Sequence, residues 1–412
     1  VRTTLQNAAL ANGYLAHLED YDDTHFPTVL HPSSPCVPAA FAVAEDRGLS
    51  GRDLVAAVAL GIEASCRISV AVHPWHYDEG WHITGTMGAF GSAIAAGKLL
   101  GLSVERMVAC LGVTGTQAAG VREVFGSMTK PFHAGRAAQA GLVGALLAER
   151  GFTSTPRILE GRRGVFAVMS PESEASRVTD GLGSRWEMFN NGLKPYACGV
   201  VNHPLIDACV ALRQRPGFDI ARIESIEADV HPLVLELVNL AEPQVGLQGM
   251  CCVLHCLAAG LVDGACHPQQ FTDARVQDPT LIELRRKVRL TRNDSFEEDE
   301  GVVTLVLQGG ERLTEHVEHA TGAPQNPLSD AQLEAKFLAL AVPTLGDTKA
   351  RALLAALWRL DELDGLAELP LHCARLERSC YSRTIAYPRS VSIRNGLIQH
   401  ARNQSTIGCR CD

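Results

Sequence analysis

A run of acidic residues close to two histidines is the densest polar cluster in an otherwise apolar stretch of the sequence. Residues 20–25 read DYDDTH, and His31 follows at the start of the segment HPSSP. A carboxylate of Asp20 or Asp23 could orient His31 by a hydrogen bond and set its tautomer and pKa for proton transfer. The same run is also typical of a solvated helix end with no catalytic role. A Mg²⁺ or Ca²⁺ site is less favoured, because no Asp-x-Asp-x-Asp-Gly loop follows.

A second cluster, HPWHYDEGWHITG at residues 73–85, holds three histidines and two tryptophans. Such amphipathic rings at a helix entrance often line a pocket. Residues 84–88 read TGTMG, so a ligand can approach backbone N–H groups at a helix N-terminus, which is a natural position for a carboxylate. The glycines do not follow a phosphate-binding pattern, and this argues against a nucleotide.

Two lysines precede prolines. The ring of Pro131 biases Lys130 toward extended geometry, so we expect the Lys130 amine to project from a loop. It is then either a surface lysine or a cation that binds a substrate carboxylate. Lys194 opens the segment KPYACG at the point where two domains should meet, and crevices between domains are favoured ligand sites.

Several other kinds of site are not favoured. The sequence has no GxSxG or HExxH motif, and no Ser-His-Asp set can be placed in it. Cys198 has only His203 nearby on the chain to activate it as a nucleophile. The chain has 37 Lys+Arg against 46 Asp+Glu, and its net charge of −9 argues against a nucleic-acid partner.

The 13 cysteines predict reduced, buried thiols rather than disulfides. Their number is odd, the chain is long, and no signal peptide stands at its start, so we expect a cytoplasmic location. They also lack the paired spacing of zinc or iron–sulfur sites. No apolar run reaches about 18 residues, since Glu63 and Lys98 interrupt the longest ones, and this excludes a membrane span.

These candidate residues must be positioned by a mainly helical fold with a smaller α+β lid. The first half of the chain is rich in Ala and Gly, whose small side chains permit close packing of helices. Residues 1–189 are predicted to form the first part of a helical domain, and we expect further helices upstream of Val1. The helices are expected at residues 6–20, 37–48, 50–73, 84–101, 103–120 and 133–150.

The pattern changes after about residue 190. Residues 190–322 are predicted to form the α+β lid, with helices at 203–214, 247–264 and 279–288, a strand at 223–231 and a hairpin at 302–317. The hairpin prediction rests on two alternating runs that flank Gly309 and Gly310. Residues 323–370 are expected to return to the helical domain as helices 330–341 and 347–361. Residues 371–412 carry seven arginines and two acids, and are expected to form an irregular basic tail.

Five motifs together resemble the MmgE/PrpD family, which includes 2-methylcitrate dehydratase, cis-aconitate decarboxylase and iminodisuccinate epimerase. The resemblance spans about residues 8–368. It implies a discontinuous helical domain with an α+β lid, a homodimer, and no metal or organic cofactor. The motifs are LAHLEDYDDTHFPTVLHPSSPCVPAAFAVAE, GWHITGTMGAFGSAIAAGKLLGL, TKPFHAGRAAQAG, LKPYACGVVNHPLIDA and GLQGMCCVLHCLAAGLVDGA.

The resemblance also implies the site residues. The residues proposed to transfer a proton, or to orient the residue that does so, are His82, His31, Asp20 and His255. For substrate binding the resemblance implies Thr24, Lys130 and Lys194, and we propose Tyr196 of the KPYACG segment as a further binding residue. The sequence departs from the family at three places: residues 250–252 read MCC where many relatives have Lys-Phe-Ser, Leu254 replaces a common Tyr-His pair, and Gly199 stands where the cis-aconitate decarboxylases have His.

The implied chemistry acts on a small polycarboxylate with a proton on the carbon beside a carboxylate. His82 and His31 would share proton transfer while Lys130 and Lys194 hold the developing charge. The leading interpretation is dehydration of a 2-methylcitrate-like substrate. Epimerisation of an imino- or amino-dicarboxylate is an alternative, because it shares the intermediate of dehydration. Decarboxylation of the cis-aconitate type is another, because it uses the same carboxylate-binding groups and protonates the residual carbanion. A truncated, non-catalytic paralogue is an alternative of another class.

Overall fold

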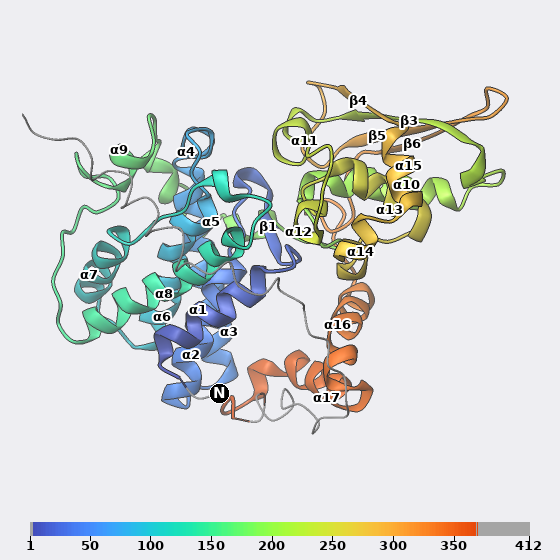
Figure 1. Cartoon of the computed structure of the whole chain (residues 1–412). Helices are drawn as coiled ribbons and strands as arrows, with labels where there is room; N and C mark the ends of the chain where they lie inside the picture. Colours follow the sequence, from blue (N-terminus) through green and yellow to red (C-terminus); the bar gives the residue numbers. More distant parts are fainter. Residues whose placement is uncertain (1–2, 368, 370–412) are drawn as a thin grey trace, which may run out of the picture.

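Long helices rich in Ala and Gly build the first part of the chain (Figure 1). The computed structural model describes residues 3–367 and 369. Serine side chains cap several helix N-termini, as when Ser50 accepts a hydrogen bond from the Asp53 N–H. The main helices are α1 (Leu5–His17), α2 (Ser33–Arg47), α3 (Gly51–Val70), α6 (Gly88–Leu99), α7 (Val104–Gly115) and α8 (Thr129–Glu149), with short helices α4 (Trp75–Asp78), α5 (Ile83–Thr86) and α9 (Val165–Met169).

Small residues let these helices cross closely. A Cβ atom at Gly135 of α8 would lie 2.4 Å from the Leu10 carbonyl of α1, and one at Gly141 would lie 2.4 Å from the Ala93 nitrogen of α6. Either substitution would therefore push two backbones apart. Helix α8 begins four residues earlier than the predicted helix at 133, so the expectation that Lys130 lies in a loop is wrong. Pro131 is tolerated there because the first turn has free N–H groups.

The α+β part contains a four-stranded sheet in the order β4-β3-β5-β6. Its strands are β3 (Ile223–Val230), β4 (Val288–Arg292), β5 (Gly301–Leu307) and β6 (Arg312–Val317). Strand β3 pairs parallel with β4 and antiparallel with β5, and β5 and β6 form the predicted hairpin. Its turn contains Gly309 and Gly310 with φ of 92° and 83°, a backbone region that favours glycine.

Helices α10 (His203–Arg213), α13 (Val253–Asp263) and α15 (Pro279–Arg286) supply apolar side chains to one core with this sheet. The predicted helix 247–264 is broken into α12 (Gly246–Gly249) and α13, and the Cys252 side chain caps the second piece. Helices α11 (Pro232–Leu237) and α14 (Asp273–Val276) complete this part. The prediction of a mainly helical protein with a smaller α+β part is confirmed.

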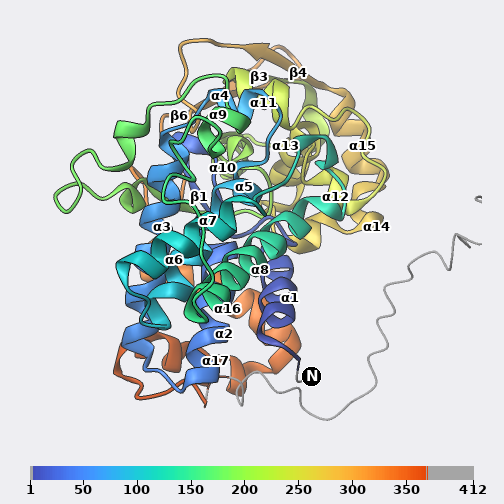
Figure 2. The same ribbon diagram turned by 90° about the vertical axis from the view of Figure 1, so that its left-hand side faces the viewer.

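The last described helices return to the first part of the chain. Figures 1 and 2 show α16 (Asp330–Leu345) leading away from the sheet and α17 (Asp347–Trp358) beneath the N-terminal helices. Leu345 and Leu353 pack in one core with Ala40 of α2 and Leu54 of α3. We keep 1–189, 190–322 and 323–370 as proposed domain ranges, whereas the predicted tail 371–412 lies outside the described residues.

Within the described part of the chain, no helix is both long and apolar enough to cross a membrane. The nine cysteines found there all carry free thiols, as expected from the sequence.

Candidate active site

A two-stranded sheet that the sequence did not predict joins the two halves of the site. Strand β1 (Asp23–His25) pairs antiparallel with β2 (Asn191–Leu193), and Asp23 lies opposite Leu193. The pairing brings the turn before β1, which contains Asp20, beside Lys194, which follows β2 directly. Lys194 Nζ donates to the Asp20 carboxylate over 2.8 Å and to the Asp20 carbonyl oxygen over 3.1 Å.

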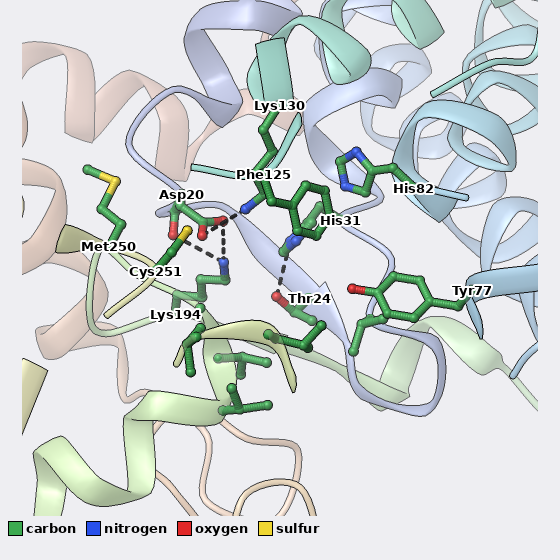
Figure 3. Close-up of a pocket in the computed structure, with 16 residues that line it drawn as sticks. Asp20, Thr24, His31, Tyr77, His82, Phe125, Lys130, Lys194, Met250 and Cys251 are labelled. Atoms are coloured by element: carbon green, nitrogen blue, oxygen red, sulfur yellow. Dashed lines mark hydrogen bonds and ion pairs between the residues drawn. The ribbon is translucent and has the colours of Figure 1, made fainter. Parts of the chain in front are cut away.

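Asp20 and Lys194 line a cavity whose empty space, part of which is open to solvent, is about 540 Å³. It lies where the helical part meets the segments that follow β2, and Figure 3 shows the polar side chains around it. The lining residues are Asp20, Thr24, Val29, His31, Tyr77, His82, Phe125, Lys130, Lys194, Gly199, Val200, Val201, Leu237, Val238, Met250 and Cys251.

Two lysines flank one carboxylate in this cavity. Lys130 and Lys194 each place Nζ 2.8 Å from an Asp20 carboxylate oxygen, and Figure 3 shows them approaching from different sides. Burial opposes ionisation of Asp20, but the charges of Lys130 and Lys194 outweigh it and hold the pKa of Asp20 well below its usual value. Burial likewise opposes the charge on Lys130, yet Asp20 raises the pKa of Lys130. The trio therefore carries one net positive charge, which suits a carboxylate ligand.

Two residues beside the cavity have an uncommon backbone conformation. Asp20 has φ of 46° and Val29 has φ of 53°, both in the left-handed region. Asp tolerates this region better than most residues, whereas a β-branched valine rarely adopts it. Such conformations persist where the surrounding structure enforces them, and they often occur at functional sites.

His31 has a defined tautomer. Its Nδ1 lies 2.7 Å from the Asp23 carbonyl oxygen and 3.1 Å from Thr24 Oγ1. A carbonyl oxygen can only accept, so Nδ1 carries the hydrogen and a neutral His31 keeps its lone pair on Nε2. Burial and the nearby Lys194 lower the pKa of His31 to about 3, so the unliganded side chain is neutral at physiological pH.

His82 lies beside His31 at the cavity, with its ring centroid 6.5 Å from that of His31. Its Nδ1 lies 2.9 Å from His133 Nδ1, and its ring meets the edge of Phe125 at a centroid distance of 5.0 Å. Burial, together with His17 and Lys130, holds the pKa of His82 well below its usual value. His82 is therefore a second neutral imidazole in the same cavity.

We predicted that the Asp20 carboxylate could orient a histidine, and the structure shows that it does not. The Asp20 side chain binds the two lysines, and the main-chain carbonyl of Asp23 orients His31 instead. The Asp23 carboxylate accepts hydrogen bonds from Ser33 and Asn191. The Asp23 side chain therefore links the start of α2 and strand β2 to the site.

Models of two family domains match most of the chain. The MmgE/PrpD N-terminal domain matches residues 1–178, and the MmgE/PrpD C-terminal domain matches residues 196–362. The chain belongs to the MmgE/PrpD family. This bears out the resemblance noted in the sequence motifs.

Three relatives within the family are cis-aconitate decarboxylases. The chain is 31% identical over 399 residues to that of Aspergillus terreus, covering 89% of this chain and 81% of the relative. It is 28% identical to that of Mus musculus, with 88% and 77% covered. It is 27% identical to that of Homo sapiens, with 88% and 78% covered.

Six of the eight proposed site residues line one cavity, and two do not. Both ring nitrogens of His255 have partners, because Nε2 lies 2.9 Å from the Gln270 carbonyl and Nδ1 lies 3.3 Å from Arg285 Nη1. Tyr196 donates to Asp207 over 2.6 Å. Neither residue is among those that line the cavity. The six that do are Asp20, Thr24, His31, His82, Lys130 and Lys194.

Four further side chains at the cavity were not anticipated from the MmgE/PrpD resemblance. Tyr77 and Phe125 line it, and burial raises the pKa of Tyr77 to about 12, so its hydroxyl stays protonated. His17 and Asp22 lie behind the catalytic candidates, with His17 Nδ1 2.8 Å from an Asp22 oxygen. The only sequence signal for His17 was its position at the end of the helix that precedes the acidic run.

The histidines also have spacing that a metal ion could use. One ring nitrogen from each of His17, His31 and His82 lies within 4.8 Å of the other two, and three imidazoles can bind zinc. The ammonium groups of Lys130 and Lys194 lie at the same cavity and repel a divalent cation. The donor set therefore suits proton transfer better than metal binding.

Proposed function

We propose that this protein is a lyase of the MmgE/PrpD family that decarboxylates a small, cis-aconitate-like tricarboxylate. One observation carries the chemical part of the proposal: two ammonium groups and a neutral imidazole with a free Nε2 lone pair share one cavity. This set suits reactions through a carbanion beside a carboxylate, since the lysines stabilise negative charge and the imidazole transfers a proton.

In this mechanism Lys130 and Lys194 bind substrate carboxylates and give up part of their contact with Asp20. One C–C bond to a carboxylate breaks, and its electron pair moves through the conjugated double bond onto the carbon beside a second carboxylate. The lysines stabilise the resulting charge on that carboxylate. A protonated His31 then delivers its Nε2 proton to the carbon. The negative charge of the bound substrate favours this protonated form of His31.

We place decarboxylation first among the candidate reactions because the relatives that match along most of the chain are cis-aconitate decarboxylases. Dehydration of a 2-methylcitrate-like substrate is the second candidate, and Gly199 favours it. Gly199 lines the cavity where the cis-aconitate decarboxylases are expected to have a histidine. In dehydration the neutral His31 removes the proton and a β-hydroxyl leaves, through the same kind of intermediate.

An NMR assay in D₂O tests the proposal with cis-aconitate, citrate, 2-methylcitrate, malate and iminodisuccinate. We expect CO₂ release from cis-aconitate and one deuterium on the carbon that receives the proton. Loss of water from 2-methylcitrate would instead support the second candidate, and deuterium uptake without net reaction would indicate epimerisation. No reaction in any sample, with a cooperative thermal unfolding transition, would contradict the enzyme and favour a non-catalytic paralogue.

The variant Gly199→His addresses the choice between the two candidates. A Cβ at this position would lie 3.0 Å from Val238 Cγ1, a tight contact that a small shift of one methyl group relieves. If dehydration is the native reaction, adding the imidazole should raise the ratio of decarboxylation to dehydration. Gly199→Ala controls for the added Cβ alone.

We also propose a cytoplasmic homodimer that needs no metal or organic cofactor. Light scattering of the purified protein tests the dimer. Dialysis against a chelator tests cofactor independence, because full activity should remain afterwards.

A further inference from the structure

The pair formed by His17 and Asp22 has no role in the mechanism above. His17 is the last residue of α1, and only 1% of its surface is exposed. Its Nδ1 lies 2.8 Å from Asp22 Oδ2. The rest of the His17 ring points into the histidine cluster, with its centroid 4.7 Å from that of His31 and 6.0 Å from that of His82.

The free atom of this pair is a proton acceptor. Nδ1 of a neutral His17 must carry the hydrogen, because the Asp22 carboxylate can only accept. Nε2 then keeps its lone pair, and this buried atom has no hydrogen-bond partner among the described residues. Buried polar atoms without a partner are uncommon, and one that faces a reactive site needs an explanation.

A carboxylate and a helix end lie beside His17. The Asp22 carboxylate is in contact with it, and the C-terminal end of α1 carries the partial negative charge of the helix dipole. Asp22 lies farther from His31, with an oxygen 4.0 Å from His31 Nδ1. Beyond burial, the charge of Lys194 lowers the pKa of His31, and the charges of His17 and Lys130 lower that of His82. Of these three imidazoles, His17 therefore has the shortest contact with a carboxylate.

His17 is also connected to a route for proton exchange. It lines a second cavity of about 280 Å³, which shares Asp20, Lys130, Met250 and Cys251 with the first. A water molecule in this space could exchange protons between His17 and solvent without passing the substrate.

From these observations we infer that the His17–Asp22 pair is a proton reservoir for His31. The inference rests on the proposed function. His17 acts on the substrate only through His31, so it is a positioning residue. In decarboxylation the N–H bond at His17 Nε2 breaks and its proton passes through one water to His31 Nε2. The proton then forms the new C–H bond, and solvent reprotonates His17. In dehydration the proton moves the opposite way, from the substrate carbon to His31 and then to His17.

The test compares three variants on the substrate that the wild type turns over. His17→Asn retains a donor to Asp22 but lacks the ring acceptor, and kcat should fall on the order of 10²-fold while KM changes little. Asp22→Asn should lower kcat less, because it removes the counter-charge but keeps the hydrogen bond.

His76→Asn is the matched control. His76 is equally buried, and its ring nitrogens contact the Met169 carbonyl and Thr86, neither of which lines the cavity. It should reduce Tm without lowering kcat.

Chemical rescue separates a proton role from a structural one. Free imidazole added to His17→Ala should restore part of kcat, and imidazoles of different pKa should do so to different extents. The inference is overturned if His17→Asn retains wild-type kcat. It is also overturned if imidazole fails to restore His17→Ala while its Tm falls as in the control.

If the wild type turns over none of the test compounds, the proposed function fails, and nitrogen NMR of the unliganded protein then tests the pair separately. In mildly alkaline buffer we expect a hydrogen on Nδ1 and none on Nε2 of both His17 and His31. The opposite tautomer at either residue would exclude the reservoir.

Discussion

Two groups of buried polar side chains in this protein differ in what their atoms face. At the cavity, His31 Nε2 has no hydrogen-bond partner among the residues that the structure describes, and Lys130 and Lys194 share a single carboxylate. In the α+β part, His255 uses both ring nitrogens, bonding Gln270 and Arg285. Burial lowers the pKa of His31 and of His255 alike, to about 3 and about 4. The comparison shows that a perturbed pKa does not by itself distinguish the two regions, whereas unused bonding capacity at a cavity does and supports the proposed site.

The largest expected effect is on catalysis at the cavity. His31→Asn keeps a side-chain donor for the Asp23 carbonyl but has no ring nitrogen to transfer a proton. We expect kcat to fall about 10³-fold, within the range for loss of a general acid or base, with Tm nearly unchanged. Steady-state kinetics and calorimetry measure the two effects, and a loss of Tm as large as the loss of activity would make His31 structural.

The second-largest expected effect is on both substrate binding and the free energy of unfolding. Lys194 is 2% exposed and bonds Asp20, so Lys194→Met leaves part of a buried carboxylate without its partner. We expect a loss of about 3 kcal/mol in the free energy of unfolding, since Lys130 still neutralises Asp20, and a fall of kcat/KM on the order of 10². The double variant Lys194→Met with Asp20→Asn should recover stability but not activity. Recovery of both would show that the pair is only structural.

We expect acid to lower the free energy of unfolding through both regions. In the folded protein His31 and His255 have lowered pKa values, so between about pH 6.5 and 4 the unfolded chain binds protons there that the folded chain does not. Stability therefore falls as pH drops through this range, by up to about 1.4 kcal/mol per pH unit for each histidine. Unfolding at several pH values should show a shallower slope in His255→Asn. An unchanged slope would mean that His255 is already protonated in the folded state.

The smallest effect is expected at Tyr196. Tyr196→Phe removes the hydrogen bond to Asp207, whose other oxygen still accepts from the Thr321 N–H. We expect a loss of about 1 kcal/mol in unfolding free energy and a kcat within about twofold of the wild type. A large rise in KM would support the proposal from the sequence that Tyr196 binds substrate.

Local patterns predicted much of the fold. The small-residue helices, the hairpin at Gly309 and Gly310, and the capped helix that starts at Asp330 all occur close to the expected positions. Strand β4 and the break before α13 were not predicted, since β4 depends on backbone pairing with β3 and the break lies at a bridge between Cys252 and Asn239. Strands β1 and β2 are three residues each, too short to give a periodic signal.

The sequence by itself determined which chemical groups the site could use: the acidic run with His31, the second histidine cluster, and the two lysines beside prolines. Only the tertiary structure decided how they are connected, because pairing of β1 with β2 sets Asp20 against Lys194. It also decided which histidine nitrogens are free, since the tautomer of His31 depends on a carbonyl and that of His17 on a carboxylate. Residue types limit the possible reactions, but hydrogen bonds formed on folding decide which atom holds the proton.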